Sequence, residues 1–287
     1  MSATRELLLC ADDFGLSAPI SRGILQLAAQ GRLSEVSCIV TASTWPRAAA
    51  ELMALPAVAQ GRIRVGLHWN LTEGVPLSSA LRQRWPQLPS LPRMLALAHA
   101  RWLPRAALAA ELDAQFAAFE QAAGCAPAFV DGHQHVHHLP VLRSLLLQRV
   151  NARPGLQVRN TGRLAGPGFA FKRLVIERSG GRSLARQLGP ARRALNEVLL
   201  GVYDFGERAY RPLMQAWLAA LPPRGGMVFC HPGDAPEDGA DPIAAARQRE
   251  LAYLRSDEFA ADLASAGVRL ASEGPAAVDQ KGQHQHA

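Results

Sequence analysis

The chain has 287 residues, of which 48% are hydrophobic and 19% charged, with a formal net charge of +7. This composition excludes a chain that is disordered throughout, and the length allows a single large α/β domain, because α/β barrels run to about 250 residues. We predict one domain over residues 1–274 and a flexible tail over 275–287, where hydrophobic periodicity is absent. Only about five apolar residues precede Asp12, fewer than a signal peptide needs, which predicts a cytoplasmic protein.

Short apolar segments alternate with helical patterns along the chain. The first unit is a strand over residues 5–11 and a helix over 17–32, where Ser17 is a potential N-cap. Further strands are predicted at 35–41, 63–71, 127–133, 156–160, 226–232 and 267–272, and further helices at 46–59, 105–123, 139–152, 207–220 and 244–265. Six or seven such units predict a parallel sheet, and this number favours a barrel or near-barrel over an open sheet.

Polar residues that could do chemistry follow the predicted strands. They are Asp12 and Asp13 after the first strand, His68 in the third, Asp131 and His133 in the fourth, Asn160 in the fifth, and His231 in the strand at 226–232. In a parallel barrel the carboxyl ends of the strands share one face, where active sites are built. One such histidine alone would more often be structural, but several on one rim predict a functional site.

The segment DGHQHVHH and the pair Asp12–Asp13 predict a metal site. In an extended strand, His133, His135 and His137 would face the same way at about 6.6 Å intervals, so we expect one to bind an ion and others to support it. A carboxylate with two imidazoles suits a divalent ion such as zinc, manganese, iron or nickel. Two adjacent carboxylates need a nearby cation, so one is expected to bind the metal and the other to act as a general base.

Four segments, ADDFGLS, GLHWNLTEG, DGHQHVH and CHPGD, resemble in order and spacing the YdjC-like family of carbohydrate deacetylases, which includes chitooligosaccharide deacetylases and hopanoid-associated relatives. The resemblance spans roughly residues 5–272. It implies a distorted or incomplete (β/α) barrel similar to a TIM barrel. It also implies one divalent metal ion, magnesium or zinc, a homodimer, and removal of acetyl from an N-acetylated amino sugar.

Carried over residue by residue, the resemblance implies roles for five side chains. Asp13, His68 and His133 would bind the metal, Asp12 would be the general base, and His231 would protonate the leaving amine or stabilise the oxyanion. Asp131 and His135 are candidates to hydrogen-bond a ligand histidine, with capping of the turn at Gly132 as the alternative for Asp131. Trp45 and Trp69 are candidates to offer an aromatic face to a sugar ring, and packing in the core or at the rim is an equal alternative for each.

Positive charge is concentrated in residues 143–224, which contain 15 Lys or Arg against four Asp or Glu. We predict that the part of this segment from Arg159 to Arg211 contacts an anionic or lipid-linked substrate or an anionic membrane surface; a solvated basic face is the alternative. Nucleic acid is not expected, because no aromatic–basic interleaving accompanies the charge. The alternative functions are a barrel metallohydrolase of phosphoesters and a non-catalytic protein that binds sugars or anionic lipids.

Overall fold

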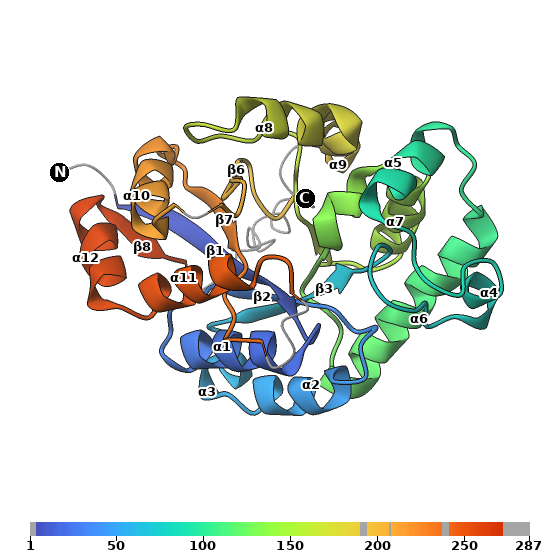
Figure 1. Cartoon of the computed structure of the whole chain (residues 1–287), viewed down its shortest axis with the longest axis horizontal. Coiled ribbons are helices and arrows are strands. Elements are labelled where there is room, and N and C mark those ends of the chain that lie inside the picture. Colours follow the sequence, from blue (N-terminus) through green and yellow to red (C-terminus); the bar gives the residue numbers. More distant parts are fainter. Residues whose placement is uncertain (1–3, 190–193, 207, 237–240, 272–287) are drawn as a thin grey trace, which may run out of the picture.

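A single parallel sheet forms the centre of the computed structural model, which describes residues 4–189, 194–206, 208–236 and 241–271 (Figure 1). The strands are β1 (Arg5–Phe14), β2 (Glu35–Cys38), β3 (Arg64–Trp69), β4 (Phe129–Gly132), β5 (Gln157–Val158), β6 (Leu199–Leu200), β7 (Gly226–Cys230) and β8 (Val268–Leu270). Their order is β5-β4-β3-β2-β1-β7-β6, and β8 pairs with the start of β1. All pairings are parallel, so the carboxyl ends of the strands lie on one face.

The barrel does not close between β5 and β6. Among the described residues, only the isolated bridges Val158–Ala194 and Leu164–Leu199 connect this side. The chain between these two short strands makes a helical excursion instead of a continuous ladder. The predicted distorted or incomplete (β/α) barrel is therefore confirmed.

Helices surround the sheet. They are α1 (Ala18–Ala29), α2 (Trp45–Met53), α3 (Pro56–Ala59), α4 (Ser79–Arg82), α5 (Leu91–His99), α6 (Arg105–Ala123), α7 (Leu142–Asn151), α8 (Ala170–Ile176), α9 (Arg182–Leu188), α10 (Tyr210–Ala220), α11 (Ala244–Leu254) and α12 (Asp257–Ser265). In Figure 1, α1, α2 and α3 lie below the sheet, whereas α8 and α9 lie at the top of the view. The Ser17 hydroxyl accepts a hydrogen bond from the backbone N–H of Ile20, as the predicted N-cap requires.

Two predicted helices are each divided in the structure. The helix expected over residues 46–59 breaks at Leu55, which is extended with ψ 131°, because Pro56 disfavours helical geometry in the residue before it. The helix expected over 244–265 breaks at Ser256, the N-cap of α12. The stretch between the predicted strand at 156–160 and the predicted helix at 207–220, for which no helix or strand was predicted, contains α8, α9 and β6.

The histidine-rich segment is not an extended strand. Residues His133–His138 form a short 3-10 turn, η1, after β4, in which Gln134 and His135 have positive φ angles of 53° and 61°. The expected alternation of side chains is therefore wrong, and the four imidazoles point to different partners.

None of the helices in the described ranges is long and apolar enough to cross a bilayer. The division into a domain over 1–274 and a flexible tail over 275–287 stays a prediction, and the tail lies outside the described residues.

Gly66 in β3 should be essential for sheet packing. A Cβ at this position would lie 2.5 Å from the ring of Phe129 in the neighbouring strand β4, and that ring is fully buried. We expect Gly66→Ala to lower the free energy of unfolding by about 1–3 kcal/mol, measured by urea denaturation. The double variant Gly66→Ala/Phe129→Leu should recover part of this loss; equal stability of the wild type and the single variant would contradict the packing argument.

Candidate active site

A distortion of β1 turns two adjacent carboxylates toward the same cavity. In a regular strand, successive side chains point to opposite faces. Here the register of β1 against β2 shifts between Ala11 and Phe14, and Asp13 has a φ of 69°. This left-handed backbone is uncommon outside glycine, and aspartate tolerates it better than most residues. As a result, both Asp12 and Asp13 line one cavity at the carboxyl end of the sheet.

Asp13, His68 and His133 bring three potential metal ligands together. The Asp13 Oδ1 lies 2.9 Å from His133 Nδ1 and 3.4 Å from His68 Nε2. One ligand atom from each residue lies within 4.8 Å of the others, and all three side chains are buried. They come from β1, β3 and the start of η1, so this grouping exists only in the folded barrel. One carboxylate and two imidazoles fit the donor set of a divalent ion with open positions.

Neighbouring side chains orient these ligands. Asp131 Oδ1 lies 2.6 Å from His68 Nδ1, and the Ser37 hydroxyl donates to the same oxygen at 2.6 Å. With Nδ1 held this way, Nε2 of His68 faces Asp13. Burial alone would lower the pKa of His68, but the surrounding carboxylates of Asp131, Asp12 and Asp13 raise it to about 10. Such a strongly anionic environment attracts a cation.

Arg159 lies at the centre of a second cluster of buried charges. Its two terminal nitrogens donate to both oxygens of Asp12, each at 2.6 Å, and Nη2 lies 2.6 Å from Asp131 Oδ2. The guanidinium is fully buried. Cys10, Asp12 and Asp131 would otherwise form another group of possible metal ligands, but the guanidinium already compensates their charge.

His231 lies across the cavity in a partly apolar setting. Its backbone N–H donates to the buried carboxylate of Glu250, and its ring lies edge-on to Phe205 and Phe229 at centroid distances of 5.1 and 5.6 Å. Burial lowers the pKa of His231 to about 4, although Asp13 and Asp12 act in the opposite direction. The imidazole is therefore neutral at pH 7 in this structure.

Arg247 is a site residue that the sequence pattern did not reveal. It extends from α11, and its Nη2 donates to Asp13 Oδ2 at 2.8 Å while its Nε donates to Asp241 at 2.6 Å. Burial opposes ionisation of Asp13, but Arg247 and His133 hold its pKa well below the ordinary value. Because Arg247 engages Oδ2, Oδ1 of Asp13 is left to face the two imidazoles.

Three further residues of the site, Ser37, Glu73 and Glu250, were not predicted from the sequence. Ser37 lies in a predicted strand, and Glu73, whose Oε2 lies 3.1 Å from His133 Nε2, belongs to the quoted segment GLHWNLTEG. Glu250 and Arg247 lie in a helix, where no strand-end position marks them. Strand-end position therefore does not identify these two residues as part of the site.

The remaining histidines of η1 are not placed against a metal ligand. His137 Nε2 lies 3.1 Å from the carbonyl of Arg159, and His138 contacts Thr161 and Ser179 through its two ring nitrogens. His135 lines the cavity with its ring edge-on to Phe229 at 5.2 Å. Asp131 lies beside His68, at the position predicted for it. His135 was also predicted to hydrogen-bond a ligand imidazole, but in this structure its ring packs against Phe229 instead.

The three residues predicted to contact substrate are buried instead. Trp45 stacks on Phe119 at 5.6 Å and donates its Nε1–H to the carbonyl of Ala118, and Trp69 is fully enclosed in the core. Arg159 forms ion pairs inside the protein. Long-range packing and charge pairing therefore cover all three side chains in this structure, and their contact with a substrate stays a prediction.

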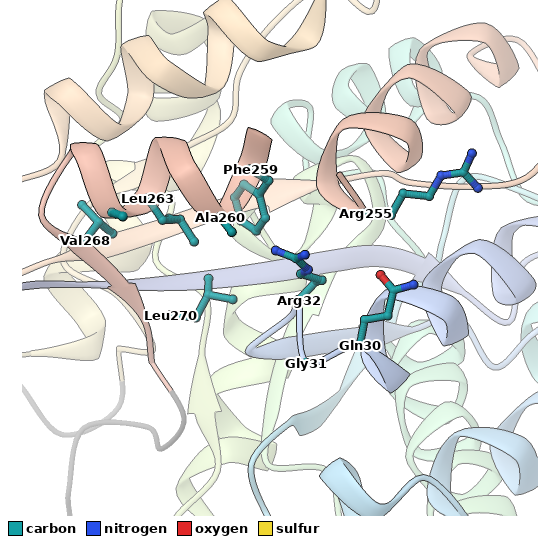
Figure 2. Close-up of a pocket in the computed structure, with 10 residues that line it drawn as sticks. Gln30, Gly31, Arg32, Arg255, Phe259, Ala260, Leu263, Val268 and Leu270 are labelled. Atoms are coloured by element: carbon teal, nitrogen blue, oxygen red, sulfur yellow. The ribbon is translucent and has the colours of Figure 1, made fainter. Parts of the chain in front are cut away.

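The cavity that contains Asp12, Asp13, His133 and His231 has a volume of about 700 Å³. A second hollow, also of about 700 Å³, lies between α1, α12 and β8, and Figure 2 shows Arg32 next to Phe259 in its wall. The described residues that line this second hollow include no carboxylate or imidazole. The chemistry is therefore concentrated in the first cavity, which combines a metal donor set, a further carboxylate and an imidazole, the groups that hydrolysis requires.

Comparisons with known proteins give a matching family profile and relatives named as deacetylases. The profile of the family described as "YdjC-like protein" matches residues 6–265. The chain is 34% identical over 160 residues to a chitooligosaccharide deacetylase of Enterobacter sp. (strain 638), covering 53% of this chain and 58% of that protein. It is 34% identical over 196 residues to a carbohydrate deacetylase of Mus musculus, covering 65% and 55%. The matches therefore span little more than half the length of these relatives.

A solved structure shares the fold. It is a protein of Enterococcus faecalis V583 whose name refers to cellobiose-phosphate cleavage, with a TM-score of 0.69 and 18% identity, covering 94% of this chain and 97% of that one. At this identity the likeness shows the fold alone.

Replacing Arg159 should destabilise the protein strongly, because it leaves Asp12 and Asp131 buried without their counterion. We expect Arg159→Met to lower the free energy of unfolding by about 3–5 kcal/mol in chemical denaturation. Arg149→Met is the matched control, since Arg149 makes the same bidentate contact with Asp113 at the surface and should lose about 0–1 kcal/mol. Equal losses in the two variants would contradict a special role of the buried pair.

Proposed function

The chain belongs to the YdjC-like protein family, and on that premise we propose that it is a metal-dependent N-deacetylase that hydrolyses the acetamide of an N-acetylated amino sugar. The observation that carries this proposal is the convergence of Asp13, His68 and His133 beside Asp12, which belongs to a separate ion pair. One carboxylate can thus bind an ion while its neighbour remains available as a base.

We assign the metal to Asp13, His68 and His133, and magnesium or zinc is the ion we expect. A divalent ion held there would act as a Lewis acid toward the acetamide carbonyl and lower the pKa of a water molecule. Two residues hold the proposed ligands in position. Asp131 fixes the His68 ring, and Arg247 donates to the second oxygen of Asp13.

Asp12 is the proposed general base. The bidentate contact with Arg159 fixes the orientation of its carboxylate at the wall of the cavity, so that it can take the proton of an attacking water. Hydrolysis of the amide then needs a hydrogen donor, and His231 on the cavity wall is the candidate. The neutral imidazole can hydrogen-bond to the developing oxyanion through its N–H, whereas protonation of the departing nitrogen requires that His231 first take up a proton from solvent.

The relatives support an acetylated sugar as the substrate class, since they are named as chitooligosaccharide and carbohydrate deacetylases. The alternative, a two-metal phosphoesterase, is weakened because Arg159 fills the neighbouring Cys10–Asp12–Asp131 cluster where a second ion would otherwise bind. A cytoplasmic location and a homodimer stay predictions.

The ligand and base roles should separate by mutation. His133→Ala should lose bound metal and deacetylation together, because it removes one of three ligands. Asp12→Asn should retain the metal but lose about 10²–10⁴-fold in turnover, because an amide cannot take the proton. Metal content by mass spectrometry and acetate release from N-acetylglucosamine oligomers are the measurements, with the thermal midpoint as a control for folding. Wild-type acetate release by Asp12→Asn would eliminate the general-base assignment.

The role of His231 can be determined by comparing substrates whose leaving groups differ in their need for a proton. If its imidazole protonates the departing nitrogen, His231→Ala should slow amide hydrolysis far more than hydrolysis of an activated acetyl ester, whose leaving group needs no proton. Losses of equal size on both substrates would assign His231 to oxyanion stabilisation instead. Metal content should be unchanged in this variant, because His231 is outside the proposed ligand set.

A further inference from the structure

Helix α8 displays an apolar surface that the rest of the described chain leaves uncovered. None of its residues is buried, and Phe171, Leu174 and Val175 are 79%, 38% and 43% exposed. Their spacing of three and four residues places them on one side of the helix, and we call them the α8 stripe. Exposed apolar clusters of this kind mark interaction surfaces, whereas isolated exposed apolar residues are ordinary.

A different side of α8 forms part of the active-site cavity. Lys172 and Ile176, which are four residues apart, both line that cavity. The Lys172 ammonium donates to the carbonyl of Tyr203 at 2.6 Å and lies 4.9 Å from the centre of the Phe205 ring. The same short helix therefore faces the cavity on one side and presents the α8 stripe on another.

An apolar wall connects the reaction centre to α8. It begins at His231, whose ring contacts Phe205 and Phe229, and it continues to Ile176, which packs against the cluster that contains Phe229. A sugar ring that presents its acetamide to Asp12 and His231 would have this wall beside it. Such a wall suits an apolar group attached to the sugar better than a further polar sugar unit.

The charge around α8 selects among possible partners. Residues 163–186 contain six basic side chains and one acidic side chain. The basic residues are Arg163, Lys172, Arg173, Arg178, Arg182 and Arg186, and the single acidic residue, Glu177, pairs with Arg182. An apolar stripe within a basic segment is complementary to an anionic bilayer, whose interior accepts apolar side chains and whose headgroups attract arginine and lysine.

We propose that the α8 stripe inserts into the surface of an anionic lipid bilayer and that the substrate is an acetylated amino sugar linked to a lipid, whose apolar part lies along the wall formed by Phe205, Phe229 and Ile176. The inference rests on the proposed function for its sugar chemistry. It adds the membrane surface, the element that binds it and the apolar portion of the substrate. Figure 1 shows α8 at the outer edge of the molecule, on the side away from α2 and α3.

The test compares wild-type protein with Phe171→Ser/Leu174→Ser/Val175→Ser. Binding is measured by cosedimentation with phosphatidylglycerol vesicles and with phosphatidylcholine vesicles over a salt series. Wild-type protein should bind the anionic vesicles, and more weakly as salt rises, whereas the triple variant should lose about tenfold or more in partitioning. Its thermal midpoint should stay unchanged, because none of the three side chains is buried.

The matched control is Phe171→Leu/Val175→Ile, which keeps the stripe apolar and should keep vesicle binding. Activity is measured on lipid-linked N-acetylglucosamine in the vesicles and on a soluble N-acetylglucosamine dimer. The triple variant should lose the first activity in proportion to its lost binding and retain the second, since the stripe lies outside the cavity.

The outcomes distinguish the inference from the proposed function. Deacetylation of the soluble dimer together with indifference of the wild type to vesicles would overturn the membrane inference and leave the deacetylase intact. Vesicle binding without acetate release from any substrate would overturn the proposed deacetylase activity and retain the membrane-binding role of the α8 stripe. A change from dimer to monomer in the triple variant by analytical ultracentrifugation, without vesicle binding by the wild type, would assign the stripe to a second copy and overturn the inference.

Discussion

The buried guanidinium of Arg159 is the interaction on which the rest of the site depends. Two carboxylates, Asp12 and Asp131, lie in a core where an unpaired charge is very unfavourable, and Arg159 contacts both. Asp131 in turn holds His68, and His68 faces Asp13. The same cation therefore stabilises the proposed base and, through one intermediate carboxylate, orients a proposed metal ligand. An arginine suits this task because its planar fork matches two carboxylates and stays charged when buried.

The distorted backbone of β1 allows two adjacent aspartates to face the same cavity. Adjacent aspartates in a regular strand would diverge, one toward the barrel and one toward the helices. The irregular pairing of β1 with β2 and the left-handed conformation of Asp13 bring both into the same cavity but against different partners. Asp12 meets Arg159, whereas Asp13 meets Arg247 and the imidazoles. Different surroundings thus give two identical side chains different partners, and the different roles proposed for them rest on this difference.

The open side of the barrel places a helical segment beside the cavity. Because β5 and β6 are only two residues long each, the intervening chain is free to form α8 and α9 next to the cavity instead of closing the sheet. The segment brings Lys172 and Ile176 to the cavity and leaves the α8 stripe outward. The part of the chain with the strongest positive charge is consequently also a part that borders the cavity.

The alternation of strands and helices and the parallel barrel could be predicted from the amino-acid pattern, because hydrophobic periodicity is a local feature. The same pattern placed six polar residues at strand ends, namely Asp12, Asp13, His68, Asp131, His133 and His231. The contacts that these residues make depend instead on the folded chain. Arg247 reaches Asp13 from a helix 234 positions away in the chain, and Trp45, Trp69 and Arg159 are covered by distant segments. The turn at His133–His138 likewise follows from packing, since its imidazoles bond to residues 159, 161 and 179. Partners of this kind are chosen by the folded barrel as a whole, and no local pattern encodes them.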